Sequence, residues 1–144
     1  MKNEYALILD QLTSMRKLRK KILDDINASL KEINSRDFIV LHNICRGIKE
    51  PTMSDLSESS GLSNALITSS IDSLEGLKLV KRKRGPDRRS YVLKLTADGI
   101  AKCKEMEKLK YSSINSIFSS MTGEDIATLK EILKKLNELM EKYT

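Results

Sequence analysis

The chain has 144 residues, of which 26 are Lys or Arg, 20 are Asp or Glu and one is His, and its formal net charge is +6. Hydrophobic residues make up 40% and charged residues 32%, a balance typical of a globular domain and unlike that of a disordered or membrane-spanning chain. The early apolar run 6–9 lies between Glu4 and Asp10, and no stretch approaches the ~20 apolar residues of a spanning helix. We therefore expect one domain without a secretory signal, no membrane partner and a cytoplasmic location.

Residues that carry catalysis or bind metals are scarce. His42 is the single histidine, and Cys45 and Cys103 lie far apart without a CxxC motif. This pattern argues against a zinc site and against a disulfide framework. We interpret the cysteines as small hydrophobic core residues and His42 as a partly buried helix residue. With no glycine-rich phosphate loop either, we expect no enzymatic activity, no cofactor and no metal.

The positive charge is concentrated in one segment. Between Lys78 and Arg89 there are seven basic residues and one acidic residue, Asp87, so this segment carries a net charge equal to that of the whole chain. A basic segment on an otherwise neutral body is typical of a protein that binds a polyanion. The alternative interpretation is a solvated charged loop.

Hydrophobic spacing predicts helices at both ends of the chain. Apolar residues recur every three or four positions over 4–33, which predicts a long first helix. A second helix is expected after Ser35, taken as its N-cap. The chain then ends in two helices, one over 97–120 and one from Thr122 to about 143. The apolar positions of the last helix repeat every 3.5 residues, a spacing suited to packing on another helix.

The middle of the chain predicts a helix-turn-helix. A short helix over 53–60 is followed by Gly61, a residue suited to a left-handed turn, and by the N-cap Ser63. A second helix is expected over 64–77. Its buried positions are expected to be Leu66 or Ile67, then Ile71, Leu74 and Leu77.

A basic hairpin follows this helix pair. Residues 80–84 and 91–95 are predicted to be strands with a Gly-Pro-Asp turn between them. In the second strand Tyr91, Leu93 and Leu95 alternate with Val92 and Lys94, as on a strand with one buried side and one polar side. A helix-turn-helix followed by a hairpin is a winged helix. Its second helix fits the B-DNA major groove, which is about 12 Å wide, and its hairpin reaches the neighbouring backbone or minor groove.

The ordered motifs resemble the multiple-antibiotic-resistance regulator (MarR) family of winged-helix transcription factors. The matching residues are 53–63, 71–75, Leu79-Val80, Asp87-Arg88-Arg89 and 93–99, and the resemblance covers essentially the whole chain. It implies a mainly α fold with a small β-hairpin, in which a winged helix-turn-helix of residues 36–96 is flanked by dimerisation helices over 1–34 and 97–144. It implies a homodimeric, sequence-specific DNA-binding regulator, expected to be a repressor on a pseudo-palindromic operator in double-stranded DNA.

The resemblance also implies which residues bind DNA. They are Thr52, Ser54, Ser63, Asn64, Thr68, Ser69, Lys83, Arg84, Arg88 and Arg89. Asp87 is expected to brace the wing by pairing with Arg89, while one of the two arginines enters the minor groove. Asn64 is the candidate for reading a base edge, since an amide can bond adenine bidentately. The alternatives are a plain N-cap for Ser63 and a solvated helix face for its neighbours.

Two features depart from the family pattern. Residues 52–77 contain four acidic residues and no Lys or Arg, although many relatives place basic residues on the recognition helix. We therefore expect DNA affinity to depend heavily on the wing and on helix dipoles. The family's usual glycine after the recognition helix is replaced by Lys78, so the sequence does not fix the residue at which that helix ends.

The outer helices carry more apolar surface than a small winged helix can cover. In the family they form a two-fold dimer, and the contacts expected here are Tyr5, Leu9, Leu12, Leu133, Leu136, Met140 and Tyr143. The alternative is that these residues close the core of a monomer.

A winged-helix module that binds protein instead of DNA is the rival function. Family members also bind small aromatic effectors, and whether this chain has an effector stays open.

Overall fold

The computed structural model describes residues 2–47, 49–87 and 90–143. Its elements are α1 (Lys2–Ser29), α2 (Ser35–Arg46), α3 (Met53–Ser60), α4 (Asn64–Gly76), β1 (Val80–Arg84), β2 (Tyr91–Leu95), α5 (Ala97–Phe118) and α6 (Gly123–Glu141). The predicted mainly α fold with one β-hairpin is confirmed. The chain divides into two compact units, residues 1–110 and 111–144. Within the described ranges, no helix is long and apolar enough to cross a membrane.

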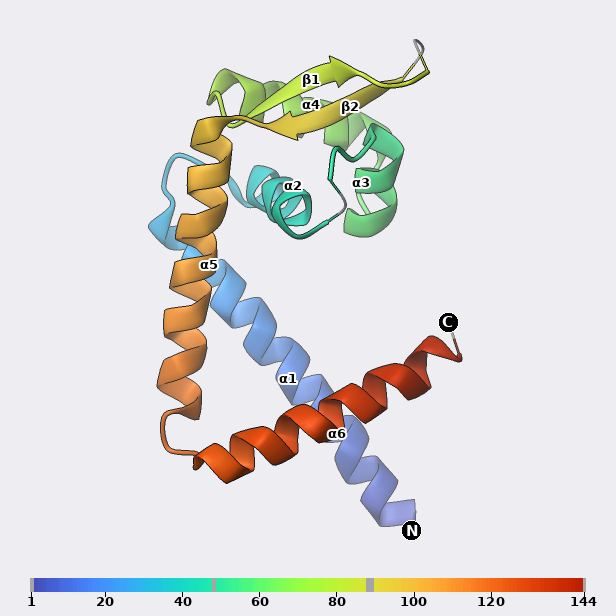
Figure 1. Ribbon diagram of the computed structural model, residues 1–144, viewed down its shortest axis with the longest axis vertical. Coiled ribbons are helices and arrows are strands. Elements are labelled where there is room, and N and C mark those ends of the chain that lie inside the picture. The colour runs from blue at the N-terminus through green and yellow to red at the C-terminus, as the bar shows by residue number, and fades with distance from the viewer. Residues whose placement is uncertain (1, 48, 88–89, 144) are drawn as a thin grey trace. The chain divides into compact units, whose positions relative to one another are not determined.

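In the first unit, α2, α3 and α4 lie together on one side of the β1–β2 hairpin (Figure 1). Every one of these elements contributes buried side chains to the core, among them Leu41, Leu56, Ile67, Ile71, Leu74, Val80 and Leu93. Three of the core positions expected on α4 are therefore confirmed. Leu77 is not buried but 37% exposed, because α4 ends at Gly76 and the chain turns there. A single core thus holds the helix-turn-helix and the hairpin together.

The end of α4 is a Schellman motif built without its usual glycine. The Lys78 N–H donates to the Glu75 carbonyl (2.9 Å), and the Leu79 N–H donates to the Leu74 carbonyl (3.0 Å). This pattern places Lys78 in the left-handed region with φ of 61°. A residue with a Cβ is strained there by about 1–2 kcal/mol, so the departure from the family's glycine costs stability at this position.

Lys78→Gly is expected to raise the free energy of unfolding by about 1 kcal/mol, since glycine adopts a positive φ without the steric penalty. Lys78→Ala is the matched control, because it removes the same charge and keeps the strained backbone. Urea denaturation of both variants and the parent measures the difference. Equal stability of the glycine and alanine variants would contradict the strain.

The start of α5 is held against the root of β1 by a very close backbone approach. The Thr96 hydroxyl accepts from the Gly99 N–H (2.9 Å) and donates to the Lys78 carbonyl (2.6 Å). An ideal Cβ built on Gly99 would lie 1.9 Å from the Leu79 carbonyl oxygen. The glycine of the run Leu95-Thr96-Ala97-Asp98-Gly99 therefore has a steric reason: only glycine lets the start of α5 lie against this carbonyl.

The end of α1 differs from its prediction. Residues 30–33 form a turn in which the Leu30 and Ile33 N–H groups bond to the carbonyls three residues earlier, so the helix ends at Ser29. The N-cap of α2 is Asn34 and not Ser35, because the Asn34 side chain accepts from the Asp37 N–H (2.9 Å). Both residue types are good N-caps, and local sequence does not choose between adjacent ones.

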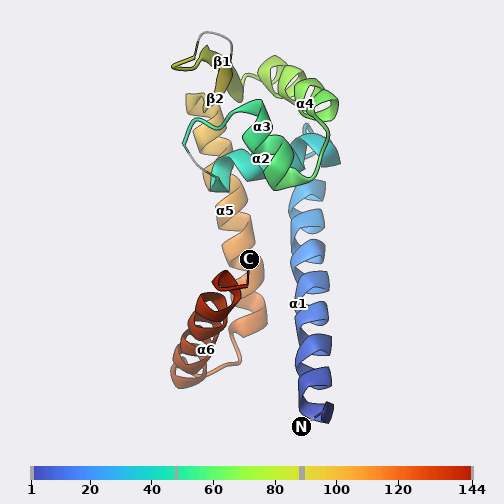
Figure 2. The ribbon, with the colours of Figure 1, turned by 90° about the vertical axis from the view of Figure 1, so that its right-hand side faces the viewer.

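Most of α1 has no cover within the first unit. Its C-terminal end contributes Ile26 to the core, whereas the rest of the helix leads away from the α2–α4 lobe (Figure 2). Among the predicted dimer contacts on this helix, Tyr5 is 63%, Leu9 64% and Leu12 39% exposed. Exposed apolar side chains at this density on one helix are typical of an interaction surface.

The second unit consists of the end of α5 and the helix α6. Thr122 forms a capping box with Asp125, which confirms the predicted start of this helix. No residue of α6 is fully buried. The remaining predicted dimer contacts range from half-buried to exposed; they are Leu133, Leu136, Met140 and Tyr143.

The cysteines correct the sequence interpretation. Cys45 of α2 and Cys103 of α5 are joined by a disulfide bond, with their Cα atoms 5.6 Å apart, and are not separate core hydrophobes. They are 58 residues apart in sequence, and only the packing of α5 beside α2 makes them neighbours. Their spacing could not reveal this, since a disulfide depends on distance in space and not along the chain.

Candidate nucleic-acid interface

The turn between α3 and α4 is held by local hydrogen bonds. Gly61 adopts φ of 72°, and its N–H donates to the Ser57 carbonyl (3.0 Å). The Ser57 hydroxyl in turn donates to the Leu62 carbonyl (2.6 Å). The predicted left-handed turn is confirmed, and it fixes α4 relative to α3 as a helix-turn-helix requires.

The N-terminal half of α4 exposes the polar residues that the sequence singles out. Ser63 is the N-cap and accepts from the Leu66 N–H (3.3 Å). Asn64, Thr68 and Ser69 are exposed on the side of the helix away from its buried residues. The Thr68 hydroxyl donates to the Asn64 carbonyl (2.9 Å), which leaves its oxygen able to accept. The helix therefore offers a small, polar surface of amide and hydroxyl groups.

Arg36 of α2 reaches this same helix. Its Nη2 donates to the Ser69 hydroxyl (3.0 Å) and its Nε to the buried Ser70 hydroxyl (2.9 Å). The guanidinium is thereby held beside a helix that has no Lys or Arg of its own. Sequence reasoning missed this residue, because Arg36 lies more than thirty positions before the two serines that it contacts and only tertiary packing brings it there.

The N-terminus of α3 lies next to the hairpin. Thr52 forms a capping box: its hydroxyl accepts from the Asp55 N–H (3.1 Å) and its N–H donates to the Asp55 carboxylate (2.9 Å). The Thr52 oxygen accepts within the helix cap and its O–H can still donate, while Ser54 in the first turn is exposed. Exposed N–H groups and hydroxyls at a helix N-terminus suit a phosphate.

The hairpin is anchored at its root to the start of α3. Thr52 forms a β-bridge with Val92, and the Leu93 N–H donates to the Pro51 carbonyl (2.9 Å). This third extended segment covers Val92, which is 8% exposed although it was expected on the polar side of the strand. The wing therefore has a fixed position relative to the helix pair.

Basic side chains cover the outer side of the hairpin. Lys81 and Lys94 are directly opposite each other in the strand register, and both are exposed. Lys83 lies 3.7 Å from the Glu50 carboxylate, and the Arg84 guanidinium lies 5.9 Å from the centre of the Tyr91 ring. Like charges opposite each other destabilise a sheet, so this pairing indicates a surface built for a negative partner.

The tip of the wing lies partly outside the described residues. Arg88 and Arg89 are not described, so their predicted DNA contacts and the pairing of Asp87 with Arg89 stay predictions. Asp87 itself is exposed.

Arg82 of β1 neutralises the acidic end of α4. Its Nη2 donates to the Asp72 carboxylate (2.6 Å), and its Nη1 donates to the Glu75 carboxylate. The pKa of Arg82 is raised, first by the hydrogen bond with Asp72, so the guanidinium is held in its charged form. Two of the acidic residues that distinguish this recognition helix from its relatives are therefore paired with a cation.

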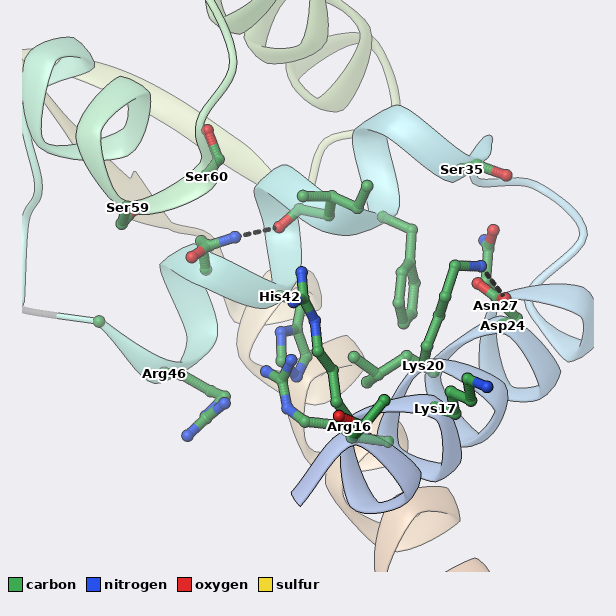
Figure 3. A pocket seen from close by; sticks show the side chains of 17 residues that line it. Arg16, Lys17, Lys20, Asp24, Asn27, Ser35, His42, Arg46, Ser59 and Ser60 are labelled. Atoms are coloured by element: carbon green, nitrogen blue, oxygen red, sulfur yellow. Dashed lines mark hydrogen bonds and ion pairs between the residues drawn. The ribbon is translucent and has the colours of Figure 1, made fainter. Parts of the chain in front are cut away.

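A positively charged cleft of about 1020 Å³ lies between α1, α2 and α3 (Figure 3). Five basic side chains line it: Arg16, Lys17, Arg19, Lys20 and Arg46. Asp24 also lines the cleft, and Lys20 pairs with it at 2.7 Å. The cleft therefore favours an anionic ligand over a neutral one.

His42 lies in this cleft in a half-buried position, as predicted, and stacks on Phe38. Its Nε2 is buried without a hydrogen-bond partner among the described residues. Burial first, and then the positive charges of Lys110, Arg46 and Arg19, lower the pKa of His42 to about 4. The imidazole is therefore neutral at pH 7.

Acidification is expected to destabilise the protein through His42. The pKa is about 4 in the folded chain and ordinarily 6.5, so the unfolded chain binds this proton first. The stability it contributes is present above about pH 6.5 and is lost as pH falls towards 4. Urea denaturation from pH 7 to 4 should show a steeper loss for the parent than for His42→Gln. Parallel curves, or an NMR titration of this single histidine with its midpoint near 6.5, would contradict the shift.

The similarities to known proteins agree with this geometry. No family model matches the chain. Among curated proteins it is similar to the HTH-type transcriptional regulator TcaR of Staphylococcus aureus (strain Newman), with 28% identity over 100 residues. The match covers 67% of this chain and 66% of TcaR, slightly less than two thirds of that protein.

Solved structures share the fold over almost the whole chain. Wild-type apo MarR from E. coli has a TM-score of 0.70 and 27% identity, covering 89% of this chain and 96% of that one. A MarR transcriptional regulator from Methanosarcina mazei Go1 has a TM-score of 0.73 and 21% identity, covering 96% and 99%. Streptococcus pneumoniae FabT, solved in complex with DNA, has a TM-score of 0.69 and 23% identity, covering 97% and 99%. The resemblance to the MarR family is confirmed, and these relatives are transcriptional regulators rather than enzymes.

Proposed function

We propose that this chain, a winged-helix protein with the MarR-family fold, is a sequence-specific DNA-binding transcriptional regulator that acts in the cytoplasm. One observation carries the proposal: the exposed polar half of α4 lies on the same lobe as a hairpin with opposed lysines. A helix whose N-terminal half carries small polar groups can enter the major groove, and a basic hairpin can lie along the adjacent phosphates.

The residues divide into two roles. Asn64, at the exposed start of α4, is proposed to read a base edge. The hydroxyls of Ser54, Ser63 and Ser69 and the cations of Arg36, Lys81, Lys83, Arg84 and Lys94 are proposed to contact phosphates, whereas the Thr68 oxygen is proposed to accept from a base edge in the major groove. One of Arg88 and Arg89 is assigned to the minor groove on sequence grounds, with Arg89 paired to Asp87. Thr52 caps α3 with its hydroxyl oxygen, and its O–H is proposed to donate to a phosphate.

We propose that the chain acts as a homodimer. The support is the exposed apolar surface of α1 and the absence of fully buried residues along α6. A dimer presents two recognition helices to half-sites about one helical turn apart, so its operator is expected to be a pseudo-palindrome. Repression would follow from the dimer covering promoter DNA.

Fluorescence anisotropy across a salt series tests the proposal. Duplex DNA from the region upstream of the protein's own gene is compared with a scrambled duplex of the same composition. We expect preference for the upstream DNA and a log affinity that falls with log salt by about 0.9 for each phosphate contacted. Sedimentation of the free protein should give twice the chain mass. A flat salt series with no duplex binding would favour the protein-binding module.

Variants separate base reading from phosphate contact. Asn64→Ala is expected to reduce the preference for the upstream DNA by about 1–3 kcal/mol with little change in salt slope. Arg88→Ala/Arg89→Ala is expected to weaken both DNAs alike and to lower the slope by about 2. Lys104→Ala, an exposed position on α5, is the matched control. If the Asn64→Ala variant kept its preference for the upstream DNA, Asn64 would not be the residue that reads a base edge.

A small-molecule effector is proposed to bind the cleft between α1, α2 and α3. The basic lining favours an anionic effector. It would weaken DNA binding if it prefers a conformation in which the recognition helices are wrongly spaced. Addition of small carboxylates to the anisotropy assay tests this, and an unchanged affinity at saturating concentrations would exclude that class.

A further inference from the structure

The Cys45–Cys103 disulfide lies in the wall of a small cavity. Both cysteines are half-buried and line a cavity of about 200 Å³ between α1, α2 and α5. This volume has room for several water molecules, each of which takes about 30 Å³, and therefore for a small organic molecule. The disulfide is thus part of the lining of a cavity that is large enough for a small thiol.

One side of this cavity is apolar and the other is charged. Leu23, Phe38 and Met106 form apolar lining, while Arg46, Lys110 and Glu107 contribute charge. Arg46 directly follows Cys45 on α2, and Lys110 lies two turns after Cys103 on α5. Among the described charged groups of the lining, the cations therefore outnumber the single carboxylate.

The cations around the cavity repel one another. Burial, followed by the charges of Arg46 and Arg19, lowers the pKa of Lys110, and Glu107 offsets this only in part. His42 also lines the cavity and is neutral at pH 7, so it does not add to the positive charge. An anion beside Arg46 and Lys110 would relieve this repulsion.

We propose that the Cys45–Cys103 pair is a redox site that exchanges with small anionic thiols drawn into this cavity. The proposal concerns the sulfur chemistry of the chain and does not depend on DNA binding. Disulfides in reducing compartments are usually transient, catalytic or redox-sensing and not structural, which fits a pair that a reagent can reach.

The exchange takes two steps. A thiolate attacks one Sγ, forming a mixed disulfide with that cysteine and releasing the other as a thiolate. A second thiolate attacks the sulfur of the external thiol in this mixed disulfide, so that an external disulfide leaves and the second cysteine is released as a thiolate. The two external thiols lose two electrons, and the protein disulfide gains them. Arg46 and Lys110 favour both the arrival of an anionic thiol and the departure of each cysteine thiolate.

Three small thiols of similar size test the charge selectivity. The folded protein is treated with 2-mercaptoethanesulfonate (anionic), 2-mercaptoethanol (neutral) or cysteamine (cationic), and free cysteines are counted by alkylation and mass spectrometry. Each rate is divided by the rate of the same thiol with a neutral model disulfide, which removes differences in intrinsic reactivity. We expect the normalised rate to fall from anion to cation by about tenfold, and the spread to shrink at high salt.

Two variants locate the source of the selectivity. Lys110→Gln is expected to reduce the preference for the anionic thiol by about threefold. Lys108→Gln removes the same charge from an exposed position on α5 outside the cavity lining and should leave the preference unchanged. Free cysteines before any thiol is added would overturn the proposal. Equal normalised rates for the three thiols, reduction only in urea, or equal effects of the two variants would also overturn it.

Discussion

Gly99→Ala is expected to lower the free energy of unfolding by about 3 kcal/mol or more. The added Cβ would lie 1.9 Å from the Leu79 carbonyl oxygen, a distance that the backbone can relieve only by moving α5 away from β1. That movement would also break the Thr96 cap, whose hydroxyl joins the Gly99 N–H to the end of α4. Urea denaturation followed by circular dichroism measures the loss.

Gly76→Ala is the matched control for this prediction. It lies in α4 of the same unit, and a Cβ built there meets nothing within 4 Å. Alanine is a better helix former than glycine, so this variant is expected to be as stable as the parent or more stable by up to about 1 kcal/mol. If Gly99→Ala were as stable as Gly76→Ala, the close approach of α5 to the Leu79 carbonyl would be refuted.

Arg82→Ala is expected to weaken DNA binding by about tenfold, although Arg82 points at α4 and is not proposed to touch DNA. Its removal leaves the Asp72 and Glu75 carboxylates unpaired on the recognition helix. Each carboxylate then repels nearby phosphates by a fraction of a kcal/mol in water, and several such pairs amount to about 1.4 kcal/mol. Anisotropy with the upstream duplex at fixed salt measures the change.

A triple variant distinguishes this electrostatic role from a direct contact. Arg82→Ala combined with Asp72→Asn and Glu75→Gln removes the repelling charges and should recover most of the lost affinity. A direct phosphate contact by Arg82 would instead lower the salt slope by about 1, and the added substitutions would not restore binding. Thermal unfolding of each variant shows whether the hairpin itself has been disturbed.

The charge of the recognition helix shows how sequence and structure differ here. Residues 52–77, which form α3 and the recognition helix α4, contain four acidic residues and no cation, so the sequence alone predicts that DNA affinity depends heavily on the wing and on helix dipoles. The folded chain brings Arg36 from α2 to its exposed side and Arg82 from β1 to its acidic end. Its electrostatic character is therefore decided by residues that are distant in sequence.

The candidate site divides in the same way. Ser63, Asn64 and Thr68 could be singled out from sequence, because their place at the start of a capped helix fixes both their exposure and their orientation. Arg36 and the opposed pair of Lys81 and Lys94 could not. The position of Arg36 depends on how α2 and α4 pack. The pairing of Lys81 with Lys94 depends on the strand register, which is set only when the hairpin folds.

Local signals in the sequence were enough to predict the helices and strands and their order along the chain. The caps Thr52, Ser63 and Thr122 and the left-handed Gly61 are local signals, since each satisfies backbone groups within a few residues of itself. The hairpin strands could be predicted for the same reason, because the alternation of side chains between two faces is visible within a single strand.

Which of these elements contact one another depends on how the whole chain packs. It joined Cys45 to Cys103, turned Arg82 towards α4, and set the Leu79 carbonyl where Gly99 must lack a side chain. Each of these contacts joins residues separated by ten or more positions, and no local hydrogen bond or periodicity encodes it. Such contacts exist because one hydrophobic core holds the hairpin and helices in a fixed arrangement, which is a property of the packed chain and not of any segment.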